Sequence, residues 1–182
     1  IWQGGLSIYG ALLGFLATSI VFLRKYGYNL WLWFDLMMPS ILFGLIILQL
    51  ANFMMQFSLG TPLGLDIPND HSLAEYVEYR YRPTGFEAYQ YFQPVALYQA
   101  FAYSIVFMIS VLCLLINRKY KFLAEGTVFL FSVILMAIIR FGIGFMYFSV
   151  NKDMLLYPMQ WIALTVMIAT VFIYVVKRFQ HN

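Results

Sequence analysis

Long apolar runs separated by short polar breaks account for most of this chain. Five runs reach the roughly 20 residues that a helix needs to cross the hydrocarbon core of a bilayer. They cover about residues 6–23, 31–59, 94–116, 126–148 and 155–176. The second run is too long for one straight span, so we expect an interfacial start before Pro39 or a break near Asn52. The pattern predicts an all-α integral membrane protein, with residues 1–182 forming a single domain of five transmembrane helices.

The fourth run contains the residue around which we expect the other helices to be arranged. Arg140 lies near its middle, where inserting an arginine costs on the order of 3 kcal/mol. Because both membrane surfaces are distant, we expect this cation to face the bundle interior, a water-filled cavity or an anion. The alternative is an arginine that reaches the interface or has a purely structural partner.

Other polar groups at membrane depth are expected to line the same interior. Gln49, Asn52 and Gln56 recur at i, i+3 and i+7, so they share one helix face. The further small or polar residues that we assign to this site are Gly4, Gly5, Tyr9, Tyr98 and Gln160. The simpler alternative for each amide is a hydrogen bond between helices, worth roughly 1 kcal/mol.

Residues 60–93 form a 34-residue segment of soluble character, which we expect to be an extracytoplasmic loop. Within this segment, Ser72-Leu-Ala-Glu75 resembles a capping box and predicts a short helix from about Ser72 to Tyr81. His71 lies among acidic residues, but one histidine without fixed ligand spacing is weak evidence for a metal site. We expect no metal and no cofactor, and the loop is either functional or a solvated cap.

Composition and charge narrow the class and the orientation. Hydrophobic residues are 63% and charged residues 10%, whereas a soluble domain is about half apolar and a quarter charged. The residues at the ends of the apolar runs that share one side are Arg24, Lys25, Arg118, Lys119, Lys121, Lys177 and Arg178. The positive-inside rule makes that side, with the C-terminus, cytoplasmic. The net charge of +3 mostly reflects this bias and indicates no nucleic-acid partner.

A buried arginine beside amide side chains suits a phosphate group. The common phosphate ligand within a membrane is a phospholipid headgroup. The residues by themselves therefore predict a site for a lipid headgroup or another anionic substrate.

Five stretches also resemble, in order, motifs of the prolipoprotein diacylglyceryl transferase family. IWQGGLSIYGALLG is similar to W-x-G-G-x-x-x-H-G-G, and FDLMMPSILFGLIILQLANF is similar to D-x-x-x-P-x-x-x-x-G-x-x-x-G-R-x-G-N-F. FQPVALYQ, IIRFGIGF and YPMQWIAL resemble later motifs of the family. The resemblance implies a multi-pass protein of the bacterial plasma membrane, two further spans before Ile1 and a periplasmic head at the long loop. Since the chain begins at Ile1 and not Met, we expect upstream residues to be processed or missing.

The resemblance implies transfer of diacylglyceryl from phosphatidylglycerol to the lipobox cysteine of a prolipoprotein. This chain keeps several of the motif residues, among them Asp35, Pro39, Asn52 and Arg140. It departs from the motifs at positions expected to carry the chemistry. Tyr9 and Gln93 stand where the motifs have histidines, Gln49 replaces an arginine, and Gly144 replaces a glutamate.

Three functions are therefore weighed. The first is a degenerate, transferase-like protein that binds phospholipid, holds or presents a lipoprotein, or serves as a subunit with another membrane protein. The second is an active transferase in which Tyr9, Asp35 or a loop acid replaces the histidine. The third, a transporter or channel, is disfavoured because the chain has no paired discontinuous spans.

Overall fold

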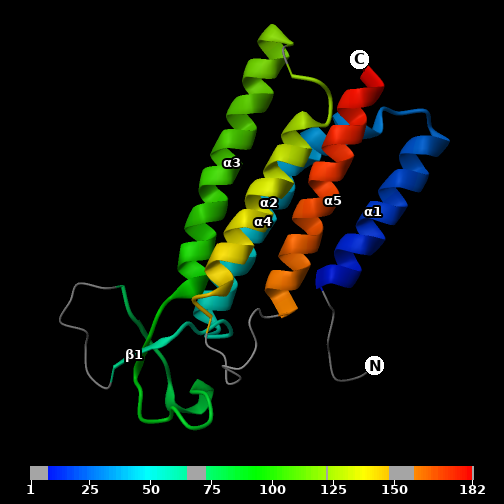
Figure 1. The fold of residues 1–182 in the computed structure, drawn as a ribbon. Coiled ribbons are helices and arrows are strands. Elements are labelled where there is room, and N and C mark those ends of the chain that lie inside the picture. The colour runs from blue at the N-terminus through cyan, green and yellow to red at the C-terminus, as the bar shows by residue number, and fades with distance from the viewer. Residues whose placement is uncertain (1–7, 65–72, 122, 148–157, 182) are drawn as a thin grey trace.

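The computed structural model describes residues 8–64, 73–121, 123–147 and 158–181, which are mostly helical (Figure 1). The helices are α1 (Ile8–Lys25), α2 (Leu30–Met54), α3 (Val95–Tyr120), α4 (Thr127–Gly144) and α5 (Pro158–His181). Three short strands, β1 (Pro62–Gly64), β2 (Glu75–Tyr76) and β3 (Tyr91–Phe92), lie between α2 and α3 in the chain. The prediction of a predominantly helical chain is confirmed.

The helices form a bundle in which α4 contacts α2, α3 and α5, while α2 also contacts α3. Within the described residues, α1 contacts only α2. Four of the described helices are long and apolar enough to cross a membrane: α2, α3, α4 and residues Met159–Lys177 of α5. That α1 is a fifth transmembrane helix stays a prediction.

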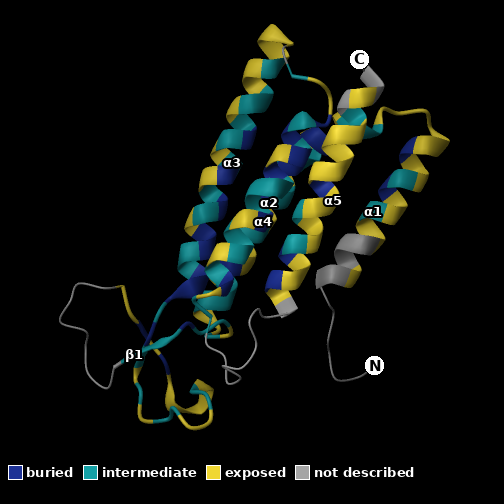
Figure 2. Cartoon of the chain, in the orientation of Figure 1, coloured by how far each residue is buried: buried dark blue, intermediate teal, exposed yellow. Residues whose placement is uncertain are grey.

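Exposed and buried residues alternate along the helices of the bundle (Figure 2). Many large apolar side chains are among the exposed residues, and several polar side chains are among the buried ones. Phe101, Ile168 and Phe172 are each about two-thirds exposed, whereas Gln99 and Gln160 are fully buried. A soluble protein shows the opposite distribution. The exposed apolar faces are therefore suited to contact with lipid.

The helix α2 runs without interruption through Pro39 and ends at Met54, two residues after Asn52. Its start is fixed by Asn29, whose side chain accepts hydrogen bonds from the backbone N–H groups of Trp31 and Leu32. Its end is followed by Gln56 in the left-handed region, with φ of 53°. The predicted break near Asn52 therefore corresponds to the end of this helix.

The segment between α2 and α3 folds into an antiparallel sheet of strand order β1-β3-β2, which we call the head. The predicted helix over 72–81 is wrong within the described residues, because Glu75–Tyr76 is a strand and Tyr79–Tyr81 a 3₁₀ turn. The reason is the alternation of buried Glu75, exposed Tyr76 and buried Val77, which suits pairing with β3. Long-range pairing has overridden a local capping signal.

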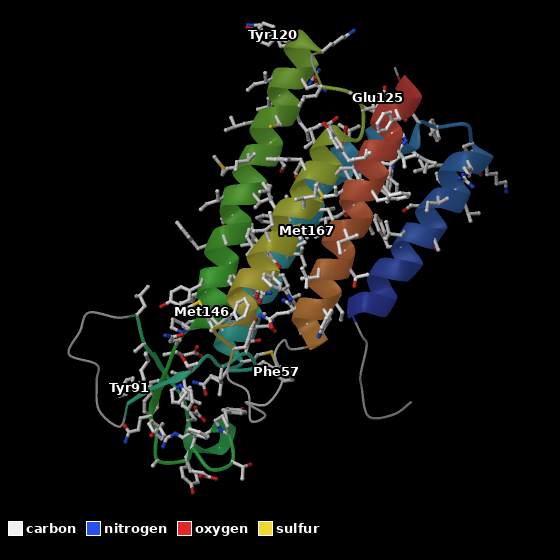
Figure 3. All side chains as sticks on the ribbon, viewed as in Figure 1. Phe57, Tyr91, Tyr120, Glu125, Met146 and Met167 are labelled. Carbon is white, nitrogen blue, oxygen red and sulfur yellow. The ribbon has the colours of Figure 1, made fainter. Side chains whose placement is uncertain are left out.

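The head and the basic helix ends lie at opposite ends of the bundle (Figure 3). Phe57 and Tyr91 mark the head end, and Tyr120 and Glu125 mark the other. The α1 and α3 termini at the second end carry Arg24, Lys25, Arg118 and Lys119. The basic residues are thus grouped as the positive-inside argument requires, and which leaflet they face stays a prediction.

Candidate functional site

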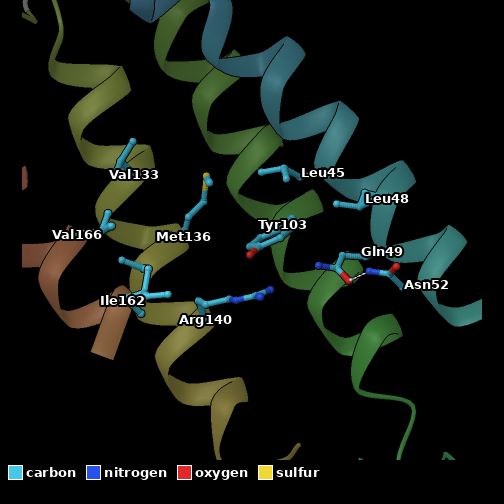
Figure 4. A pocket seen from close by; sticks show the side chains of 12 residues that line it. Leu45, Leu48, Gln49, Asn52, Tyr103, Val133, Met136, Arg140, Ile162 and Val166 are labelled. Atoms are coloured by element: carbon cyan, nitrogen blue, oxygen red, sulfur yellow. Dashed lines mark hydrogen bonds between the residues drawn. The ribbon is translucent and has the colours of Figure 1, made fainter. Parts of the chain in front are cut away.

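A pocket of about 280 Å³ lies between α2, α3, α4 and α5 (Figure 4). Four polar residues line it: Gln49, Asn52, Tyr103 and Arg140. The other lining residues are Leu45, Leu48, Val133, Met136, Ala137, Ile162, Ala163 and Val166. The pocket therefore joins a small polar region to a larger apolar one.

Arg140 belongs to the last part of α4, one turn before that helix ends at Gly144. Its half-buried side chain points across the pocket toward Gln49 and Asn52 on α2 (Figure 4). One guanidinium nitrogen, Nη2, lies 3.7 Å from the Met159 sulfur. The polar region is thus placed at the end of the pocket nearer the head.

Gln49 and Asn52 face the pocket because they are three residues apart on α2. Asn52 Nδ2 donates to Gln49 Oε1 at 3.1 Å, and Gln49 is only 3% exposed. The third member of the predicted stripe, Gln56, does not line this pocket. It lies beyond the helix end, where Nε2 donates to the Tyr76 carbonyl at 2.8 Å and Oε1 accepts from the Glu78 N–H at 3.1 Å.

Tyr103 is a pocket residue that the sequence analysis missed. Gln99 Nε2 donates to Tyr103 Oη at 2.8 Å, and Tyr147 Oη donates to Gln99 Oε1 at 2.9 Å. Since Tyr103 Oη accepts from Gln99, its own proton remains to be donated into the pocket. The i, i+4 spacing of Gln99 and Tyr103 was the signal that could have identified this pair.

Other predicted site residues lie outside the lining of this pocket. Gln160 is fully buried against Gly144, where an added Cβ would come within 2.6 Å of Gln160 Cγ. Tyr98 Oη donates to the Leu73 carbonyl of the head at 3.5 Å. The Gln93 carbonyl accepts from the Gly60 N–H at 3.1 Å.

Three predictions for the first segment remain untested. Gly4 and Gly5 lie outside the described residues. Tyr9 belongs to α1, but its side chain is also outside the described part.

Asp35 lies away from Arg140, and its role as a base in place of the histidine stays a prediction. Asp35 Oδ2 accepts from the Gly126 N–H at 2.6 Å, and Oδ1 accepts from the Phe129 N–H at 2.7 Å. Phe129 and Arg140 are 11 positions apart on α4, which corresponds to about 16 Å at 1.5 Å per residue. Asp35 instead binds the start of α4, at the opposite end from the polar region of the pocket.

None of the described loop acids lines the pocket. Glu78 pairs with Arg80 at 2.9 Å. Glu87 accepts from the Gly85 N–H at 3.0 Å, which lowers the pKa of its carboxyl. Burial in the head raises the pKa of Glu75 to about 7. The prediction that one of these acids replaces the histidine receives no support from their positions.

The arrangement suits an anion that carries an apolar tail. The Arg140 guanidinium, the Gln49 amide nitrogen and the Tyr103 hydroxyl can all donate hydrogen bonds, and a phosphate offers several acceptor oxygens. The aliphatic walls suit hydrocarbon. Among the described lining residues there is no histidine, cysteine or carboxylate.

Comparisons with known proteins show the family of this chain. The model of the prolipoprotein diacylglyceryl transferase family matches residues 1–176. The phosphatidylglycerol–prolipoprotein diacylglyceryl transferase of Geobacillus kaustophilus is 30% identical over 179 residues, covering 98% of this chain and 63% of the relative. The protein of that name from Lactobacillus acidophilus is 28% identical over 179 residues, covering 98% of this chain and 61% of the relative.

The Bacillus licheniformis protein of the same name is 34% identical over 134 residues, which cover 74% of this chain and 46% of the relative. The chain thus spans about three fifths of the length of those relatives that match nearly all of it. No solved structure matches the chain.

Proposed function

Because the chain belongs to the prolipoprotein diacylglyceryl transferase family, we propose that the pocket around Arg140 binds the headgroup of a membrane phospholipid. The names of these relatives include phosphatidylglycerol, which is therefore the lipid that we expect. The four apolar helices and the bacterial relatives fit a multi-pass protein of the plasma membrane. A lipid from the surrounding leaflet would be the natural occupant of such a pocket.

The observation that carries this proposal is the direction of the Arg140 side chain. It points into a pocket between helices, toward amide groups and beside apolar walls (Figure 4). A guanidinium can contact two phosphate oxygens at once, and such charge-assisted bonds are about twice as strong as neutral ones. The acyl chains of the same lipid would lie against residues such as Leu45 and Val166.

We further propose that the protein binds lipid without transferring it. Transfer of a diacylglyceryl group to a thiol needs a group that takes the thiol proton, and tyrosine and glutamine are poor bases at neutral pH. The motif positions with histidines are here Tyr9 and Gln93, and Gln49 occupies an arginine position. In this proposal the protein holds or presents a phospholipid or lipoprotein, alone or as a subunit of a membrane complex.

The second candidate is an active transferase. It is favoured by the match of nearly the whole chain to relatives whose names give that activity. Of its predicted bases, Asp35 accepts hydrogen bonds from the start of α4, whereas the side chain of Tyr9 lies outside the described part of the chain.

Two measurements on the purified protein separate these candidates. Native mass spectrometry after incubation with phosphatidylglycerol should detect bound lipid, and Arg140→Gln should reduce the number of bound phosphatidylglycerol molecules by one. Arg24→Gln is the matched control, because Arg24 lies at the far end of α1 and does not line the pocket. The same number of bound phosphatidylglycerol molecules in Arg140→Gln as in the wild type would refute the headgroup site.

The second measurement adds a lipobox peptide to the lipid-loaded protein. We expect no mass increase on the peptide cysteine. A diacylglyceryl-modified cysteine that disappears in Arg140→Gln would establish the active transferase and refute the non-catalytic role.

A further inference from the structure

A second groove lies at the basic end of the bundle, away from the Arg140 pocket. Its volume is about 670 Å³, and it is lined by α2, the last turns of α3 and the connection from α3 to α4. None of its lining residues belongs to the Arg140 pocket. Tyr103 in that pocket and Arg118 in this groove are 15 positions apart on α3, or about 22 Å along the helix.

The floor of this groove is apolar and exposed. Leu36 of α2 is 56% exposed, and Leu115 of α3 is 59% exposed. Both belong to helices that are apolar enough to cross a membrane. Leu36 and Leu115 therefore present a surface for hydrocarbon within the bilayer.

The rim of the groove carries two cations, Arg118 and Lys121. They follow Leu115 by one to two helical turns, which places the charges at the level where a bilayer has its phosphate groups. Glu125 also lies on the rim, but its carboxylate accepts a hydrogen bond from Asn29. The charged lining residues sum to one net positive charge.

The backbone holds this rim in a defined shape. Lys121 ends α3 in the left-handed region, with φ of 49°, and its N–H donates to the Asn117 carbonyl at 2.8 Å. The Asn117 side chain accepts from the Leu123 N–H at 2.8 Å and donates to the Leu123 carbonyl at 3.3 Å. The connection is thus tied back onto the helix end, so little ordering is required when a ligand binds.

We propose that this groove binds one anionic phospholipid from the leaflet at the basic end of the bundle. Arg118 and Lys121 contact the headgroup phosphate, and an acyl chain lies along Leu36 and Leu115. Basic residues between helices at a membrane surface recognise anionic lipids in this way. The apolar floor matches the acyl chain of such a lipid, and the two cations of the rim, which follow Leu115 along the chain, match its phosphate. The proposal does not depend on the function of the Arg140 pocket.

Native mass spectrometry of the full chain, with phosphatidylglycerol and phosphatidylcholine at equal concentration, tests the proposal. We expect a phosphatidylglycerol adduct that persists in Arg140→Gln. The double variant Arg118→Gln/Lys121→Gln should weaken it about thirtyfold, as expected for removing two phosphate-facing cations.

The matched control is Arg24→Gln/Lys119→Gln, which removes the same charge from the same end of the bundle. Neither residue lines the groove, and the Lys119 ammonium lies over the Tyr120 ring at 5.1 Å from its centroid. The control should keep its affinity within about threefold. Equal losses in both double variants would show attraction to general basic charge and would overturn a defined site, as would equal binding of the two lipids.

A second variant tests the apolar floor without changing charge. Leu36→Trp fills part of the groove, and the exposure of Leu36 allows the larger ring without disturbing the core. We expect the adduct that persists in Arg140→Gln to weaken while the melting temperature is unchanged. Undiminished binding in this variant would overturn the assignment of the acyl chain to this groove.

Discussion

Replacing Asp35 by alanine should destabilise the bundle by removing a helix cap that comes from another helix. Asp35 on α2 is 2% exposed, and its two oxygens accept from the Gly126 and Phe129 N–H groups at 2.6 and 2.7 Å. The N-cap residue of α4 is Gly126, which has no side chain to accept these bonds. The first backbone N–H groups of a helix have no acceptor within that helix, and Asp35 accepts from two of these groups in α4.

The magnitude follows from what the substitution leaves behind. A hydrogen bond to a charged group contributes about 1.5–3 kcal/mol, and loss of a cap costs about 1 kcal/mol in typical helices. Asp35→Ala leaves two N–H groups without this acceptor, so we expect the free energy of unfolding to fall by about 3 kcal/mol. Asp35→Asn keeps one acceptor oxygen and should cost about half as much.

Lys177 provides a second, independent check. Its ammonium lies 4.3 Å from the Trp31 ring centroid and interacts electrostatically with Asp35. Within the described residues, Lys177 Nζ is buried without a hydrogen-bond partner. Removing the Asp35 charge leaves Glu125 as the other acidic group that interacts with this buried cation. The double variant Asp35→Asn/Lys177→Met should therefore recover part of the stability that Asp35→Asn loses.

These differences can be measured by thermal unfolding in detergent, with the labelling of the single cysteine, Cys113, used to monitor unfolding. Asp35→Ala should lower the melting temperature by about 6–12 °C, at roughly 2–4 °C per kcal/mol. Asn29→Ala is the control, because it removes an ordinary cap of α2 and should cost about 1 kcal/mol. The reasoning fails if Asp35→Ala costs no more than Asn29→Ala. It also fails if Asp35→Asn loses phospholipid binding at full stability.

Three further predictions concern other contacts of the fold. Tyr103→Phe should weaken phosphatidylglycerol binding in native mass spectrometry and lower stability by about 1 kcal/mol, because the Gln99 amide loses its acceptor. Unchanged lipid binding would exclude a donor role for the hydroxyl. Gly126→Ala should lower the melting temperature by several degrees, because φ is 81° and the new Cβ would lie 2.5 Å from the Trp31 ring. The control Gly44→Ala should leave the melting temperature unchanged, because its new Cβ would have no neighbouring atom within 4 Å. Equal melting temperatures would contradict the close packing. Glu75→Gln should stabilise the head above pH 7. The buried carboxyl binds its proton more tightly in the folded protein than in the unfolded protein, so the stability of the wild type falls as the pH rises from 4.5 through 7. The expected gain is at most roughly 3 kcal/mol, and amide exchange of the head that shows the same pH slope in both proteins would refute it.

The helices could be predicted because membrane spans are specified locally, by the length and composition of an apolar run. The bounds of α3, Val95–Tyr120, begin within one residue of the prediction and extend four residues past it. The head was mispredicted because its strands pair over long distances. Glu75 lies opposite Phe92, 17 positions away, and no short motif encodes that contact.

Arg140 could be predicted because a cation at membrane depth is rare, and the amides of the candidate site could be predicted where they share one helix. The i, i+3 spacing of Gln49 and Asn52 placed both on one face, and the structure puts both in the pocket. Tyr103 was missed because its role depends on which face of α3 meets the pocket. Gln56 was misassigned because helical periodicity was extended past Met54, where the helix ends.

Asp35 and Arg140 show why a buried charge in a membrane helix has two different explanations. Asp35 is an acceptor that meets two backbone donors at the start of α4, so the fold itself compensates its charge. The pocket around Arg140 instead gathers donors, while the Gln49 oxygen already accepts from Asn52. Donors beside apolar walls suit an anion with a hydrocarbon tail, which supports the proposal that this pocket binds a phospholipid, whereas the contacts of Asp35 support a structural role.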